Sequence, residues 1–187
     1  MSSRLRRWSP SSLALALALA VSALVPVLST PSVLRAQAGS GVLGTWRFVG
    51  GADETRGIQR AIDTALADFN PVMREIVASQ LQDSNRAYPE FSIAVEGENI
   101  VTRMNGRTLS TPSNGAAREV TTPEGRTAQV TQRIQGNRLV QTLVNPQGTR
   151  THTITLGGDG NLRVEVRIVS SHLPRPIAYA LTYGPAA

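Results

Sequence analysis

Cysteine is absent from all 187 residues of this chain. Its absence excludes a disulfide framework, thiolate catalysis and a lipid anchor attached through Cys. Lysine is absent as well, so all nineteen basic side chains are Arg, and only two His are present. With two imidazoles and no thiolates, a zinc site would need scattered carboxylates that no motif brings together. We therefore expect no enzyme activity, no bound metal and no other cofactor.

A concentrated basic surface is also missing, although the formal net charge is +6. Four of the Arg lie in the first 38 residues, and beyond them fifteen Arg accompany thirteen acidic residues with alternating signs. Proteins that bind nucleic acid gather positive charge on one face, preferably with aromatic side chains. This pattern predicts no nucleic-acid partner.

The first 38 residues have the pattern of a secretory signal peptide. A basic start, Arg4 to Arg7, precedes an uncharged Leu/Ala run from Leu13 to Val25, and small residues at Ala36 and Ala38 form a cleavage site. The apolar run is short for a membrane span, so retention as an anchor is the alternative. We expect cleavage near Ala38, export to the periplasm or the medium, and a single domain over residues 39–187.

The remaining chain begins with one strand-like segment followed by two helix-like ones. Val42 to Gly50 has the composition of a strand, and from Ile58 to Phe69 apolar residues recur at a spacing of three and four. Asn70-Pro71 then supplies an N-cap and a Pro at the first helical position, and Asp83-Ser84-Asn85 ends the second helix. The helix pair is expected over about residues 54–83.

From Phe91 onward the hydrophobic period becomes two, which is typical of strands. Asn105-Gly106 is a two-residue hairpin signal between two such segments. Further strands are expected at about 117–121, 126–134, 138–144, 149–156, 162–169 and 176–183. Ten strands with turn signals every eight to twelve residues predict an antiparallel barrel or sandwich.

The Gly44-Thr45-Trp46 strand, the helix pair and the strand meander that ends near Tyr183 resemble the fatty-acid-binding proteins. Those proteins belong to the calycin superfamily, as do the lipocalins. The resemblance implies a mainly β fold: a ten-stranded antiparallel up-and-down calycin barrel with a helix pair inserted between strands 1 and 2. It also implies a carrier that holds an apolar or amphipathic, lipid-like ligand. The family's last strand often contains Arg-x-Tyr, which grips a carboxylate; the matching stretch here is Leu181-Thr182-Tyr183, without the Arg.

The turns predict which side chains share the inner face. A two-residue Gly136-Asn137 turn, a turn centred on Pro146-Gln147 and a three-residue Gly158–Gly160 loop give three registers that agree on one apolar face. A two-residue Asp159-Gly160 turn is the alternative, and it would turn Thr151, Thr153 and Thr155 to that face instead. The first set of registers aligns a polar row across the face, made of Gln132, Gln141, His152 and Arg150.

We predict that the ligand contacts this polar row, two Val beside it and the inward face of the last strand. These residues are Gln132, Gln141, Arg150, His152, Val164, Val166, Tyr179, Leu181 and Tyr183. Polar groups inside an apolar barrel need hydrogen-bond partners, so the row either receives a ligand's polar head group or is satisfied by its own members. A single haem-ligating His, His152 or His172, is a weaker alternative. Trp46 is expected to be structural, closing one end of the barrel with its indole N–H hydrogen-bonded.

The interior is expected to be hollow, because its positions are mostly small aliphatic side chains, Thr and Gln; a filled barrel is the alternative. Each ligand methylene buried there would contribute about 0.8 kcal/mol. A second hypothesis makes the protein a non-catalytic interaction module whose helix pair docks a partner protein or makes transient contact with a membrane. In that case the docking face is formed by Ile58, Ile62, Leu66 and Phe69.

Overall fold

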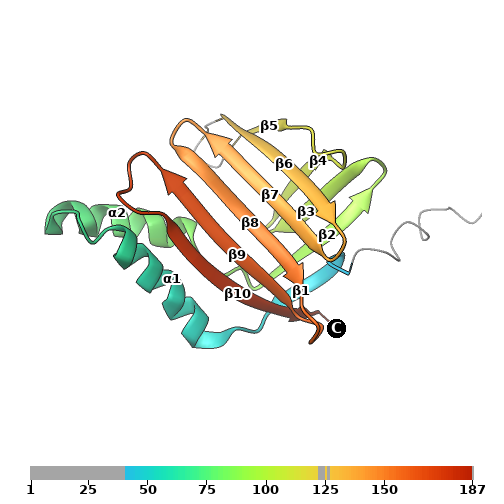
Figure 1. The fold of residues 1–187 in the computed structure, drawn as a ribbon, viewed down its shortest axis with the longest axis horizontal. Coiled ribbons are helices and arrows are strands. Elements are labelled where there is room, and N and C mark those ends of the chain that lie inside the picture. Colours follow the sequence, from blue (N-terminus) through green and yellow to red (C-terminus); the bar gives the residue numbers. More distant parts are fainter. Residues whose placement is uncertain (1–40, 122–124, 126, 187) are drawn as a thin grey trace, which may run out of the picture. The chain divides into compact units, whose positions relative to one another are not determined.

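The computed structural model describes residues 41–121, 125 and 127–186, which lie within one compact unit, Val33–Ala187. The predicted signal peptide, residues 1–38, lies outside these residues. Among the described residues no helix is both long and apolar enough to span a membrane. The elements are β1 (Gly44–Phe48), α1 (Gly51–Ala65), α2 (Pro71–Ser84), β2 (Glu90–Glu96), β3 (Asn99–Met104), β4 (Arg107–Pro112), β5 (Arg118–Thr121), β6 (Thr127–Gln135), β7 (Arg138–Asn145), β8 (Gly148–Leu156), β9 (Leu162–Ser170) and β10 (Ile177–Pro185) (Figure 1).

The ten strands form one antiparallel sheet in the order β4-β3-β2-β1-β10-β9-β8-β7-β6-β5. The first strand, β1, pairs with the last strand, β10, so the sheet curves toward a closed barrel. The sheet's edge strands, β4 and β5, are not paired with each other, but β4 lies beside β6. The result is a nearly closed barrel with two helices between its first and second strands, which confirms the predicted fold class.

Tight turns set the strand registers, as the sequence predicted. Gln135 pairs with Arg138 around the Gly136-Asn137 turn, and Asn145 pairs with Gly148 around the next one. Leu156 pairs with Leu162, and the Gly157 N–H donates to the Asn161 carbonyl oxygen at 2.8 Å, which leaves residues 158–160 as the loop. Gly160 has a φ of 79°, the left-handed value that favours Gly. The three-residue loop is therefore confirmed, and the alternative two-residue turn is wrong.

Helix α1 packs along β10 with its apolar stripe, which includes Ile58, Ile62 and Leu66. Glu54 attaches the first turn of α1 to the same strand. The Glu54 carboxylate oxygens accept hydrogen bonds from the Thr182 backbone N–H (2.6 Å) and from the Thr182 hydroxyl (2.7 Å). This carboxylate satisfies a strand N–H that would otherwise lack an acceptor.

Helix α2 begins as predicted, since the Asn70 side chain accepts from the Met73 backbone N–H (2.9 Å) and Pro71 occupies the first turn. Its packing is much weaker than that of α1. None of its residues is fully buried, and its apolar residues Val72, Met73 and Ile76 are 70, 47 and 52 % exposed.

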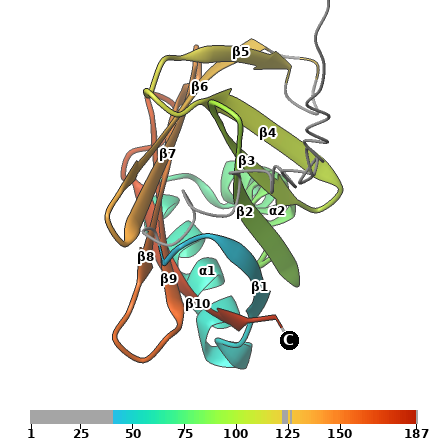
Figure 2. The same cartoon turned by 90° about the vertical axis from the view of Figure 1, so that its right-hand side faces the viewer.

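The interior differs from the expected hollow chamber. Figure 1 shows α1 running along β10, and the side chains of Ile58 and Ile62 belong to the same core cluster as those of several strands. In the view of Figure 2, α1 is seen between β10 and β1. Inward residues such as Leu139 and Ile154 are 0 and 2 % exposed. A side chain beside a water-sized void would keep some accessible surface, so these residues are closely packed.

The same packing corrects the hypothesis of a docking face on α1. Ile58, Ile62 and Leu66 are at most 5 % exposed, and Phe69 is partly buried against the core. These residues are occupied inside the protein and are not available to a partner. The apolar side chains that the helix pair exposes to solvent lie on α2 instead.

Trp46 lies in the core with 6 % of its surface exposed. Its indole N–H donates to the Val42 carbonyl oxygen at 3.1 Å, so the polar end of the ring has the expected partner. Both observations support the structural role predicted for this residue.

Candidate functional site

The predicted polar row forms a continuous chain of hydrogen bonds across the interior. Gln132 and Gln141 are paired on β6 and β7, and His152 is the neighbour of Gln141 on β8. The Gln132 amide donates to the Ile100 carbonyl oxygen (3.2 Å), and the Gln141 amide donates to Gln132 Oε1 (3.2 Å) and to Thr102 Oγ1 (3.1 Å). The first and third of these bonds reach β3, so the row ties two opposite walls together.

His152 continues the chain toward the helices. Its Nδ1 lies 2.8 Å from Gln141 Oε1, and its Nε2 accepts from Arg150 Nε at 3.0 Å. These partners assign the proton to Nδ1, because Nε2 must be an acceptor. Burial, and secondarily the positive charge of Arg150, lowers the pKa of His152 to about 3. The imidazole is therefore neutral at physiological pH.

Arg150 ends the row against the C-terminus of α2. Its Nη1 donates to the Ser84 carbonyl oxygen (3.0 Å), and its Nη2 donates to Asn85 Oδ1 (3.1 Å) and to Tyr179 Oη (3.3 Å). No carboxylate among the described residues forms an ion pair with this partly buried guanidinium. All of its described partners are neutral acceptors.

Tyr179 on β10 completes the polar cluster. Its hydroxyl donates to Asn85 Oδ1 at 3.1 Å. Burial raises the pKa of this phenol, an effect that Arg150 partly opposes. Tyr179 therefore keeps its proton and acts as a hydrogen-bond donor, so the cluster presents two donors, a cation and a phenol, to one oxygen atom.

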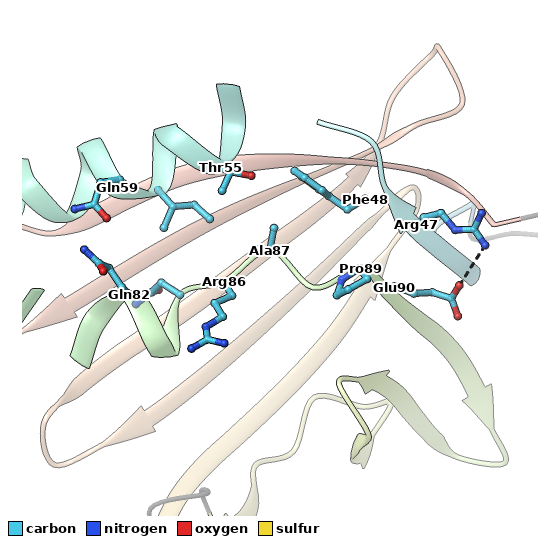
Figure 3. A pocket seen from close by; sticks show the side chains of 11 residues that line it. Arg47, Phe48, Thr55, Gln59, Gln82, Arg86, Ala87, Pro89 and Glu90 are labelled. Atoms are coloured by element: carbon cyan, nitrogen blue, oxygen red, sulfur yellow. Dashed lines mark ion pairs between the residues drawn. The ribbon is translucent and has the colours of Figure 1, made fainter. Parts of the chain in front are cut away.

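A groove of about 770 Å³ opens next to this cluster, between α1, the end of α2 and the β1–β2 wall. Its apolar lining comes from Phe48, Ile58, Ala87 and Pro89, and Asn85 also lines it. Figure 3 shows Gln59 and Gln82 facing each other from α1 and α2 at one end, and the ion pair of Arg47 with Glu90 (3.8 Å) at the other. Asn85 is thus shared between the groove and the guanidinium of Arg150.

The remaining predicted site residues lie deeper in the core. Val164, Val166, Leu181 and Tyr183 are between 2 and 8 % exposed, and the Tyr183 ring packs edge-to-face on Phe48 and Phe91. A ligand would reach these side chains only by displacing core packing. Of the nine residues, Arg150, His152 and Tyr179 keep accessible surface, and the role of all nine in binding stays a prediction.

The sequence prediction missed the α2 side of this site. Ser84 and Asn85 were assigned only the role of ending the helix, yet they supply two of the three oxygens that accept hydrogen bonds from Arg150. A buried Asn at a helix end is a weak signal that needs the tertiary structure to be recognised. In the described part of the chain, no three His, Asp or Glu side chains gather as metal ligands.

No family model and no curated protein sequence matches this chain. Among solved structures, the SAHS (abundant heat soluble) protein of Ramazzottius varieornatus is 10 % identical, with a TM-score of 0.53 over 79 % of this chain and 97 % of its own. A variant of the fluorescent protein UnaG is 15 % identical, with a TM-score of 0.50 over 79 and 97 %. Fatty-acid-binding protein 1 of Echinococcus granulosus is 15 % identical, with a TM-score of 0.48 over 79 and 98 %. The chain therefore shares the fold of the first two of these proteins, which here is a nearly closed ten-stranded barrel with a helix pair between β1 and β2.

Proposed function

We propose that this protein is a non-catalytic carrier for a small amphipathic acid, such as a long-chain fatty acid. The apolar chain of the ligand occupies the groove between the helices and the β1–β2 wall, and its acidic head group pairs with Arg150. The observation on which the proposal depends is the partly buried guanidinium of Arg150, which has only neutral partners among the described residues.

Among the described residues, Arg150 is the only Arg that is not exposed. Six of the exposed Arg form ion pairs with Asp or Glu, whereas the partly buried Arg150 forms none. Removing a guanidinium from water costs free energy, which the four hydrogen bonds of Arg150 to neutral acceptors offset without balancing its charge. A ligand carboxylate would supply the balancing anion, and its two oxygens match the fork of an Arg side chain.

The groove supports the apolar part of the proposal. Its volume of about 770 Å³ lies within the range of roughly 300–1,000 Å³ that is typical of ligand pockets. Phe48, Ile58 and Pro89 provide apolar surface along it. Each methylene that moves from water onto such surface contributes about 0.8 kcal/mol before the entropic cost of binding. Chain burial therefore supplies affinity, and the head group supplies specificity.

The proposal is tested by titrating the full chain with a saturated fatty acid and with the fatty alcohol of the same length. Charge-assisted hydrogen bonds are worth about 1.5–3 kcal/mol, so the acid should bind about 10–100-fold more tightly than the alcohol. In Arg150→Gln this preference should disappear while the alcohol still binds. Absence of binding by both ligands, or equal preference in the two proteins, would contradict the proposal.

A second candidate function is transient contact of α2 with a membrane surface. The exposed apolar side chains of Val72, Met73 and Ile76 favour it, because they lie on a helix beside the mouth of the groove. Flotation of the full chain with phosphatidylcholine vesicles tests it, with the triple Ser variant at these positions as the control. Equal flotation of the two proteins would remove this candidate.

Export is proposed as well, on the basis of the basic start, the apolar run from Leu13 to Val25 and the small residues at Ala36 and Ala38. Expression of the full chain followed by N-terminal sequencing of the exported material tests it. The expected new terminus is Gly39. Recovery of the intact chain in the cell would contradict this part of the proposal.

A further inference from the structure

The end of α2 places two oxygen atoms against one guanidinium in the manner of a bound acid. The Ser84 carbonyl oxygen accepts from Arg150 Nη1 (3.0 Å), and Asn85 Oδ1 accepts from Nη2 (3.1 Å). Two oxygens that accept hydrogen bonds from the two terminal nitrogens of one Arg reproduce the arrangement of a carboxylate bound by both of its oxygens. Here both oxygens belong to the protein itself and are neutral.

A third donor converges on the same position. The Tyr179 hydroxyl donates to Asn85 Oδ1 at 3.1 Å, so this oxygen has a cationic and a phenolic donor. The carboxamide is held in place from behind, because Asn85 Nδ2 donates to the Leu81 carbonyl oxygen at 2.8 Å. Asn85 is 2 % exposed and also lines the groove. An acidic head group entering from the groove meets this side chain before it reaches Arg150.

We infer that Asn85, with the Ser84 carbonyl, is an internal competitor for the acidic head group. This inference rests on the proposed function, in which Arg150 binds the ligand's carboxylate. A carboxylate gains more from the guanidinium than a neutral carboxamide does, so it displaces Asn85. Ligand affinity is then set by the difference between the two interactions, and binding releases the C-terminus of α2.

The packing of α2 allows this release. The helix has no fully buried residue and contributes only partly buried side chains, such as Val77 and Leu81, to the core. Few buried apolar contacts are typical of segments that open at low free-energy cost. The barrel's polar row stays intact during this exchange, since the bonds among His152, Gln141 and Gln132 do not involve α2.

Two substitutions of one residue should shift affinity in opposite directions. Asn85→Ala removes the competing oxygen, so the full chain should bind a saturated fatty acid about 3–10-fold more tightly, the effect of one net hydrogen bond. Asn85→Asp supplies an internal carboxylate for Arg150 and repels the ligand's own, so the acid should bind about 10-fold more weakly or worse. The matched fatty alcohol, which gains little from Arg150, should bind all three proteins equally.

The experiment is a titration of wild type, Asn85→Ala and Asn85→Asp with the fatty acid and the alcohol, with Gln80→Ala as the matched control. Gln80 is an exposed residue of α2 outside the groove lining, and its side chain contacts neither Arg150 nor Tyr179 in the described hydrogen bonds. Hydrogen exchange of the last α2 amides should also accelerate when wild type binds the acid. Thermal unfolding confirms that each variant is folded.

The outcomes separate the inference from the function on which it rests. A wild-type preference for the acid, with opposite shifts in the two Asn85 variants and none in Gln80→Ala, supports both. The same preference with unchanged affinity in both Asn85 variants overturns the competitor and leaves the carrier. Failure of wild type to bind either ligand overturns the carrier and the competitor together.

Discussion

The β6–β9 wall and helix α2 satisfy their polar groups in different ways. In the wall, Gln132 and Gln141 are fully buried and bond to partners within the barrel itself. At the C-terminal end of α2, Ser84 and Asn85 both accept hydrogen bonds from the guanidinium of Arg150. Three apolar side chains of this helix are exposed to solvent. The first region joins opposite walls of the barrel, and the second is the region whose contacts we propose are exchanged for those of a ligand.

If the proposed function holds, one polar row serves stability at its inner end and recognition at its outer end. The inner end is satisfied by partners on the strands themselves, so burying it costs little free energy in the absence of ligand. The outer end of the row, Arg150, is hydrogen-bonded to Ser84 and Asn85 at the end of α2, a helix with no fully buried residue. We therefore expect mutations in the wall to change stability and mutations at α2 to change binding.

The largest loss of stability is expected for Trp46→Ala, which should lower the free energy of unfolding by about 3–5 kcal/mol. The substitution leaves a cavity beside β1 and frees the Val42 carbonyl oxygen. Urea denaturation measures the loss, and ligand affinity of the folded fraction should be unchanged. Wild-type stability in this variant would show that the indole does not support the barrel.

Gln141→Leu tests the inner end of the polar row. It should lower the free energy of unfolding by about 2–3 kcal/mol, because the buried groups of Gln132, Thr102 and His152 lose a partner. The control is Gln129→Leu on the exposed face of β6, which should change stability by less than about 0.5 kcal/mol. Equal effects in the two variants would mean that the row contributes nothing to the wall.

Acid should weaken the wall through His152. The unfolded chain protonates this imidazole near its usual pKa of 6.5, whereas the folded protein does so only near a pKa of about 3. Between these values the unfolded state binds the extra proton, so the free energy of unfolding falls as the pH falls from 6.5 toward 3. The contribution is complete above pH 6.5.

His152→Gln isolates this effect, because an amide can accept from Arg150 and donate to Gln141 without titrating. Urea denaturation at about pH 7 and about pH 4.5 should show a larger loss in wild type than in the variant. Identical losses would show that His152 is not the group responsible.

The smallest effect is expected on the exposed side of α2. Ile76→Ser should change the free energy of unfolding by less than about 0.5 kcal/mol, since the side chain is 52 % exposed. Ile62→Val on the buried face of α1 is the comparison and should cost about 0.5–1.5 kcal/mol. Calorimetry of both variants compares the two helices directly. A larger loss for Ile76→Ser would indicate that α2 is part of the core.

Much of the barrel could be predicted because short turns act locally. Gly136-Asn137 and Gly158–Gly160 set strand registers within a few residues, and a register fixes the face of every side chain that follows. The alignment of Gln132, Gln141, His152 and Arg150 followed from those turns alone. Periodicity likewise located both helices to within a few residues.

What could not be predicted depends on how distant elements pack. Periodicity shows that the segment of α1 has an apolar stripe with Ile58 and Ile62, but not that this stripe packs along β10 and joins the core of the strands. The contact of Asn85 with Arg150 joins residues 65 positions apart, and no local pattern signals it. The contact of Arg150 with the Tyr179 hydroxyl reaches from β8 across β9 to β10, and periodicity alone does not show which long side chains meet in this way.

The most direct test of the carrier is a crystal structure of the full chain with a bound saturated fatty acid. We expect both carboxylate oxygens about 2.7–2.9 Å from the two terminal nitrogens of Arg150, the acyl chain in the groove beside Phe48, and Asn85 withdrawn from the guanidinium. A head group in solvent, with Asn85 and Ser84 still bonded to Arg150, would contradict this account of the protein.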